Sequence, residues 1–95
     1  MGTLKEARIT SEQCLNSDML HDFLKESLGF PDYYGRNFAA LADCLAEMGE
    51  PALITIAVDE DTLPTEMQAY ILKTAQVCAR EAVANENLNL IIEHR

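Results

Sequence analysis

Thiol, imidazole and carboxylate groups carry most enzyme chemistry, and this chain has a few of each. Cys44 and His21 could form a nucleophile and base, but His21 falls on the polar side of a short helix, where a solvated side chain is expected. The triplet Asp59-Glu60-Asp61 could bind a metal ion, yet no EF-hand spacing follows it, and Asp is common where helices begin. His94 stands at an end expected to fray. We therefore expect no catalysis, no metal site and no cofactor.

The cysteines indicate a reducing compartment. Cys14, Cys44 and Cys78 leave one thiol over under any disulfide scheme, and no Cys-x-x-Cys or Cys/His ligand spacing is present. The first ten residues, MGTLKEARIT, lack an apolar core of signal-peptide length, and no run approaches the ~20 apolar residues of a membrane span. We expect reduced, buried thiols in a cytoplasmic protein without membrane contact.

Recognition is the other chemistry that the sequence offers, at the segment PDYYGRN, residues 31–37. Turn chemistry explains three of its residues, because Pro31 fixes the approach, Gly35 can adopt a positive φ, and Asn37 can cap a following helix. The adjacent Tyr33 and Tyr34 cannot easily both point into one core. One ring is expected at the surface, where tyrosine suits an interface, although simple packing is the alternative.

Composition limits the kinds of partner. The chain has 95 residues, 48% of them hydrophobic and 24% charged, which predicts a single globular domain over residues 1–95. Sixteen Asp and Glu against seven Lys and Arg give a net charge of -9. Such a surface repels nucleic acids and anionic membranes and attracts basic proteins, although an acidic excess also serves solubility alone. We expect no direct nucleic-acid contact and a monomer in the free protein.

The elements that position these residues begin with a strand and two helices. A short strand is expected around Arg8 and Ile9. A helix follows, with Ser17 as its N-cap and Gly29 as its stop, and its apolar positions are Leu20, Phe23, Leu24 and Leu28. Asn37 can begin a second helix that ends before Gly49 and Pro51. Its apolar positions are Phe38, Leu41, Cys44, Leu45 and Met48.

The second half of the chain predicts a central strand, a long helix and a last strand. Residues 52–58, ALITIAV, are continuously apolar, which is typical of a strand covered on both faces. The acidic triplet then leads into a helical period over residues 65–86, in which a break near the start is an alternative to one continuous helix, and residues 88–93 form the final strand. The order β-α-α-β-α-β predicts an α/β fold with a small three-stranded parallel sheet, right-handed crossovers and helices over most of the sheet.

The second helix carries a polar face opposite its apolar stripe. Asp43 stands at the middle of this face. Around it lie Arg36, Ala39, Ala40, Ala46 and Glu47. Small residues let another surface come close, so the face suits docking, while a solvated surface is the plainer interpretation.

The segment FPDYYGRNFAALADCL resembles the barstar family of intracellular ribonuclease inhibitors. The similarity also includes SEQCLNSDMLHDFLKESL before it, and AREA and LNLIIE after it, so that it runs from about Lys5 to Glu93. The most specific part is Pro-acidic-Tyr-Tyr-Gly-x-Asn, followed at fixed spacing by Leu41, Asp43, Cys44 and Leu45. The resemblance implies a barstar-like fold.

It also implies a function. Members of this family block the active site of a small basic ribonuclease with the helix after the corner and the adjoining loop, so that acidic side chains take the places of RNA phosphates. Here Tyr33 would face the enzyme, Tyr34 would pack inward, and Asp43 would pair with catalytic cations. The implied contact residues are Tyr33, Asn37, Ala42, Asp43, Ala46, Glu47 and, at the periphery, Glu81.

This chain departs from the family pattern within that surface. Ala39 replaces an acidic residue, Ala42 an aromatic one, and Arg36 the acid of the best-known member. Glu47 and Met48 replace a glycine and an aromatic residue. Charge and aromatic anchors are thereby lost. The expected partner is therefore a small basic ribonuclease or another basic toxin, against which this chain would be an immunity protein. The alternative is a barstar-fold interaction module with an unrelated partner.

Overall fold

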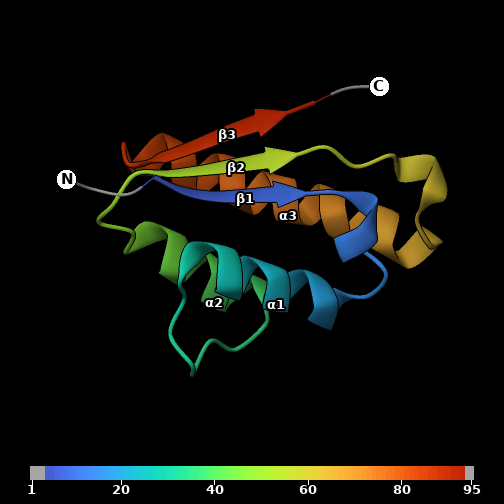
Figure 1. Ribbon diagram of the computed structural model, residues 1–95, viewed down its shortest axis with the longest axis horizontal. Coiled ribbons are helices and arrows are strands. Elements are labelled where there is room, and N and C mark those ends of the chain that lie inside the picture. The colour runs from blue at the N-terminus through green and yellow to red at the C-terminus, as the bar shows by residue number, and fades with distance from the viewer. Residues whose placement is uncertain (1–3, 94–95) are drawn as a thin grey trace.

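Three strands and three α-helices follow one another in the predicted order in the computed structural model, which describes residues 4–93 (Figure 1). The expectations for the first three residues and for His94 lie outside the described residues. The α-helices and strands are β1 (Lys5–Ile9), α1 (Ser17–Leu28), α2 (Phe38–Ala46), β2 (Ala52–Ile56), α3 (Thr65–Ala84) and β3 (Leu88–Ile92). Two 3₁₀ turns, η1 (Ser11–Gln13) and η2 (Glu60–Thr62), lie between them.

The three strands form one parallel sheet in the order β1-β2-β3, so the predicted α/β class, sheet and central strand are confirmed. Ile54 of β2 aligns with Ala7 on one side and Leu90 on the other. Parallel neighbours need long crossovers, which the helices supply. Ile54 is fully buried beneath those helices at the centre of the sheet.

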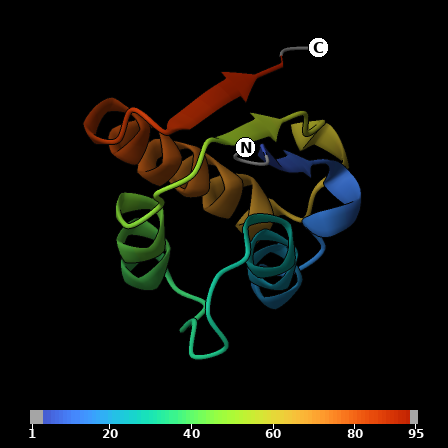
Figure 2. The ribbon, with the colours of Figure 1, turned by 60° about the vertical axis from the view of Figure 1, so that its left-hand side comes forward.

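All three α-helices lie on one side of the sheet (Figure 2). The sequence predicted that β2 is covered on both faces. Helices cover only one of them. On the other face, both terminal guanidinium nitrogens of Arg8 donate to the Glu93 carboxylate, at 3.0 and 2.9 Å. Because Arg8 belongs to β1 and Glu93 follows β3, this pair reaches across β2. Thr55, which aligns with Arg8, is buried although no helix covers it.

The N-cap of helix α1 lies one residue earlier than expected. Asn16, not Ser17, is the N-cap, because its side-chain oxygen accepts the backbone N–H of Met19 at 2.8 Å. Gly29 ends the helix as predicted, in the left-handed conformation with φ 71°. The buried residues are Leu20, His21, Leu24 and Leu28. The expectation of a solvated His21 is thus wrong.

Helix α2 begins after Asn37, as predicted, but ends at Ala46, before Met48 and Gly49. Carbonyls at its end and just after it bond to a side chain from elsewhere in the chain. The amide of Asn85, directly after α3, donates to the carbonyl oxygens of Leu45 and Met48, both at 3.0 Å. This long-range bond satisfies carbonyls that have no partner within the helix.

The acidic triplet begins a 3₁₀ turn instead of capping α3. The carboxylate of Asp59 accepts the backbone N–H of Asp61 at 3.2 Å, within η2. Helix α3 has Pro64 at its N-cap position, with no side-chain cap bond. The expected break near the start of the long helix is therefore this separate turn. Among residues 4–93, no helix combines the length and hydropathy that crossing a bilayer requires.

Candidate protein-binding surface

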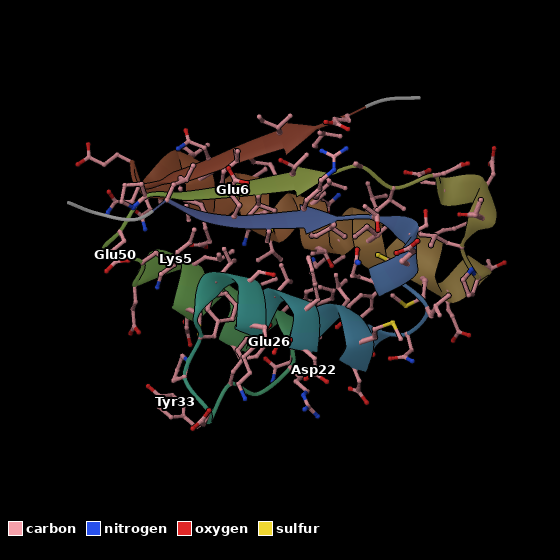
Figure 3. All side chains as sticks on the ribbon, in the orientation of Figure 1. Lys5, Glu6, Asp22, Glu26, Tyr33 and Glu50 are labelled. Carbon is pink, nitrogen blue, oxygen red and sulfur yellow. The ribbon has the colours of Figure 1, made fainter. Side chains whose placement is uncertain are left out.

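Tyr33 and Tyr34 point to opposite sides of the corner at residues 29–37. The Tyr33 side chain is 86% exposed, whereas Tyr34 is only 7% exposed. Figure 3 shows Tyr33 at the outer tip of the corner, directed away from the helices. The expected division into one outward and one inward ring is confirmed.

A hydrogen-bonded histidine holds Tyr34 inside. His21 Nδ1 lies 2.5 Å from the Tyr34 hydroxyl, and His21 Nε2 lies 2.6 Å from the Tyr70 hydroxyl. In neutral histidine one ring nitrogen donates and the other accepts, so each tyrosine hydroxyl has a complementary partner. These three residues, named the His21 clamp below, join α1, the corner and α3.

The clamp is neutral at ordinary pH. Burial lowers the pKa of His21, although the carboxylates of Asp18 and Asp22 act in the opposite direction. Burial also raises the pKa of Tyr34 well above its usual value. Since both His21 nitrogens bond to tyrosines, His21 cannot act as a base for Cys44 here.

The corner needs glycine for space, not for a positive φ. Among the described residues that are not glycine, the positive φ belongs to Arg36, at 53°, and Gly35 lies outside the left-handed region, so the expectation for Gly35 is wrong. A Cβ on Gly35 would come within 3.1 Å of the Asn37 side-chain nitrogen and 3.5 Å of the Ala40 Cβ. Gly35 therefore makes room for the cap of α2.

Two ion pairs tie the corner to α1. Arg36 Nη2 lies 2.8 Å from the Asp22 carboxylate, and Lys25 Nζ lies 3.7 Å from that of Asp32. Such exposed pairs contribute little energy individually. Arg36 is nevertheless already paired with a carboxylate of the protein itself.

Asn37 is exposed, but its amide is used locally. Its oxygen accepts the Ala40 N–H at 2.8 Å, and its nitrogen donates to the Gly35 carbonyl at 3.1 Å. The residue thus shapes the start of α2 while leaving its outer edge accessible.

The solvent side of α2 carries carboxylates among small side chains. Leu41 and Leu45 are buried, and Ala42 is half-buried. The exposed residues of the helix and its end are Ala39, Asp43, Ala46 and Glu47. Within residues 4–93, no Lys or Arg side chain forms an ion pair with Asp43 or Glu47. Both carboxylates are therefore available to the cations of a partner.

Glu81, the expected peripheral contact, lies far from α2 in the sequence. It is half-buried on α3, one turn before Asn85, whose amide bonds to Leu45 and Met48. The end of α3 therefore lies against the end of α2, near Glu47. We call the surface formed by Tyr33, Asn37, Ala42, Asp43, Ala46, Glu47 and Glu81 the α2 surface.

A cleft of about 440 Å³ borders the α2 surface, between Phe30, Cys44, Glu47, Met48 and Glu50. Burial raises the pKa of the Cys44 thiol, and the nearby carboxylates of Glu47 and Asp43 add to this effect. A thiol with a raised pKa is a weak nucleophile at neutral pH. The described residues include no group of three or more His, Cys, Asp or Glu side chains that could hold a metal ion.

Comparison with known proteins identifies the family. The family model described as "Barstar (barnase inhibitor)" matches residues 4–93. This chain belongs to the barstar family. A relative from Bacillus subtilis (strain 168) named "Putative ribonuclease inhibitor YrdF" is 38% identical over 80 residues, covering 82% of this chain and 87% of that protein. Both descriptions name inhibitors rather than enzymes.

Residues outside the sequence prediction hold the α2 surface in place. His21, Asp22 and Asn85 each connect the corner or α2 to another element, and Tyr70 bonds to His21. Helical spacing offered a signal for His21, because it lies three residues before Leu24 and seven before Leu28, both on the buried face. No local pattern marks Asp22 or Asn85, whose partners are distant in sequence or lie in a loop.

Proposed function

We propose that this barstar-family protein occludes the active site of a small basic ribonuclease, or of a related basic toxin, with its α2 surface. It would act as a monomer in the cytoplasm, as an immunity protein, and would not bind RNA itself. The observation that carries the proposal is that Tyr33 is exposed and that no Lys or Arg within residues 4–93 forms an ion pair with the exposed Asp43. An exposed aromatic ring at the corner and an available anion on the following helix are the groups that a cationic cleft would accept.

The physics of such a complex favours Asp43 as its centre. A carboxylate that enters a water-poor cleft makes charge-assisted bonds with Arg and Lys, and pairing with arginine is directional. The net charge of -9 would speed encounter with a cationic enzyme, and added salt would weaken this attraction. The complex of barnase with barstar, a member of this family, is the standard example of such steering.

The composition of the α2 surface also bears on the partner. Ala39 is exposed and Ala42 is half-buried, so neither supplies charge or aromatic area. Arg36 is held by Asp22. These features support a partner whose cleft differs from the usual family target. They also support the second candidate, an interaction module with the same fold and a partner other than a ribonuclease.

The test is inhibition of RNA cleavage by a panel of small basic ribonucleases, at low and moderate salt. Asp43→Ala should weaken inhibition about 100-fold, because Asp43 lies mid-surface, whereas Glu81→Ala at the rim should cost less than about fivefold. Glu66→Ala is the control, because Glu66 is an exposed acid in the first turn of α3. It removes the same charge without touching the α2 surface.

Three results would separate the hypotheses. Loss of inhibition in Asp43→Ala alone supports the plug mechanism. Equal small effects of Asp43→Ala and Glu81→Ala would show that the interface lies elsewhere. If no enzyme of the panel is inhibited, the interaction-module alternative is favoured, while the family assignment is unaffected.

A further inference from the structure

A second concave site lies at the carboxyl ends of β2 and β3. It is a cleft of about 410 Å³ between β2, η2, α3 and the end of β3. Figure 1 places η2 and these strand ends well away from the corner, which projects from the other side of α1 and α2. The residues that line it are Ile56, Val58, Asp59, Glu60, Asp61, Ile71, Leu72, Ala75, Ile92 and Glu93. We call it the strand-end cleft.

The floor and one wall of the strand-end cleft are apolar. Ile56 and Ile71 are buried, whereas Leu72 is 57% exposed and Ile92 is 46% exposed. Scattered exposed aliphatic residues are ordinary, but here two of them, from different elements, face one concave space. Binding to a concave apolar surface of this kind is favourable, because a complementary apolar side chain displaces water from it.

All the ionisable residues that line this cleft are acidic. Asp59 fixes the η2 turn by accepting the Asp61 N–H, so the carboxylates are presented on a defined rim. Glu60 and Asp61 are exposed, and within residues 4–93 no Lys or Arg pairs with them. Glu93 is bonded to Arg8 at the other end. The rim at η2 therefore attracts cations.

The apolar floor and acidic rim of the strand-end cleft argue against several classes of ligand. The described residues include no group of three or more His, Cys, Asp or Glu side chains that could hold a metal ion, so nothing there indicates a metal site at the rim. Nucleic acids and anionic lipids carry the same sign of charge as the rim and would be repelled. A purely apolar ligand would leave the carboxylates unused, whereas alternating apolar and cationic side chains match both features.

We propose that the strand-end cleft binds a basic amphipathic segment of a partner protein, in which aliphatic side chains alternate with Lys or Arg. The aliphatic side chains fill the space between Leu72 and Ile92, and the cations reach Glu60 and Asp61. This second docking site is independent of the α2 surface, so one molecule can hold an enzyme and this segment together.

The test uses a fluorescein-labelled decapeptide of alternating Arg and Ile, followed by anisotropy. Two control peptides separate the contributions, one with Ser in place of Ile and one with Glu in place of Arg. The alternating peptide should bind with a Kd below about 1 mM, and each control should bind at least about tenfold more weakly. Absence of binding up to about 1 mM overturns the proposal.

Matched variants locate the site. Leu72→Lys should weaken binding about tenfold or more, whereas Val83→Lys, at a 91% exposed aliphatic residue of the same helix, should not. Asp61→Lys should weaken it, whereas Glu66→Lys should not. Equal effects within either pair overturn the proposal.

Two further outcomes would name another occupant or site. Asp43→Ala should leave peptide binding unchanged, and a loss would show that the peptide sits on the α2 surface, against this proposal. Sedimentation should show a monomer. A dimer that Leu72→Lys dissociates would make a second copy of this chain the occupant and would overturn the proposal as stated.

Discussion

The inner and outer sides of the corner differ although they are built from adjacent residues. On the inner side, Tyr34 is buried, bonds to His21 and packs its ring against Phe30 at a centroid distance of 4.9 Å. On the outer side, Tyr33 lies almost fully in solvent. The difference teaches that the residue that fixes the corner is separate from the residue that we propose for recognition. The inner side fixes the corner, so the outer side can change its partner without loss of the fold.

The same division runs through α2. Leu41 and Leu45 anchor the helix in the core, whereas Ala39 and Asp43 occupy its solvent side. The departures from the family pattern at Ala39 and Arg36 fall on exposed positions, while the buried positions keep residues that pack. A change of partner is therefore compatible with an unchanged core.

The largest effect on stability is expected from His21→Ala. The substitution leaves a cavity and removes the partner of both tyrosine hydroxyls, so it should lower the free energy of unfolding by about 3 kcal/mol or more. Urea denaturation followed by circular dichroism measures this. His21→Gln keeps a donor and an acceptor and should lose less. A loss below about 1 kcal/mol for His21→Ala would mean that the clamp does not fix the corner.

The two tyrosines should give opposite phenotypes. Tyr33→Ala should weaken binding to an inhibited ribonuclease by about 2 kcal/mol and change the free energy of unfolding by less than about 0.5 kcal/mol. Tyr34→Phe keeps the ring but leaves a His21 nitrogen without its partner. It should lower the free energy of unfolding by about 1–2 kcal/mol with little effect on binding.

Inhibition assays and urea denaturation of both variants measure this contrast. If Tyr33→Ala destabilised the fold as much as Tyr34→Phe, the proposed separation of the two sides would be wrong.

The elements and their order could be predicted because their signals are local. The apolar run of β2 and the helical spacing of Leu20, Leu24 and Leu28 each lie within one segment. The Asn37 cap is equally local. These patterns placed every strand and α-helix to within a few residues, and element order then restricted the sheet to one topology.

The details of the corner could not be predicted because their causes are distant or steric. His21 is buried because Tyr34 and Tyr70 supply its hydrogen bonds, and Tyr70 lies on another helix. Gly35 leaves room for the Asn37 side chain, and the positive φ belongs to Arg36 instead. The amino-acid composition of a segment can predict a turn, but it does not show which residue adopts the positive φ.

The smallest predicted effect is a dependence of stability on pH that isolates the clamp. Burial lowers the pKa of folded His21 below the 6.5 of the ordinary side chain, with Asp18 and Asp22 opposing this shift and Arg36 adding to it. The unfolded chain therefore takes up a proton at a higher pH than the folded protein. The stability from neutral His21 is complete above pH 6.5 and declines as the pH falls below it, by at most about 1.4 kcal/mol per unit.

His21→Gln is the reference for this measurement, because it retains the carboxylates and ion pairs of the protein but lacks the titrating imidazole. The difference in the free energy of unfolding between the original protein and His21→Gln should shrink between about pH 7.5 and pH 5.5. The tyrosine hydroxyls of the clamp titrate far above this range and contribute nothing to the slope. A difference that stays constant would mean that His21 has the same pKa in the folded and unfolded chain. Protonation of His21 would then not weaken the clamp, and the burial of the ring would have no effect on the pH dependence of stability.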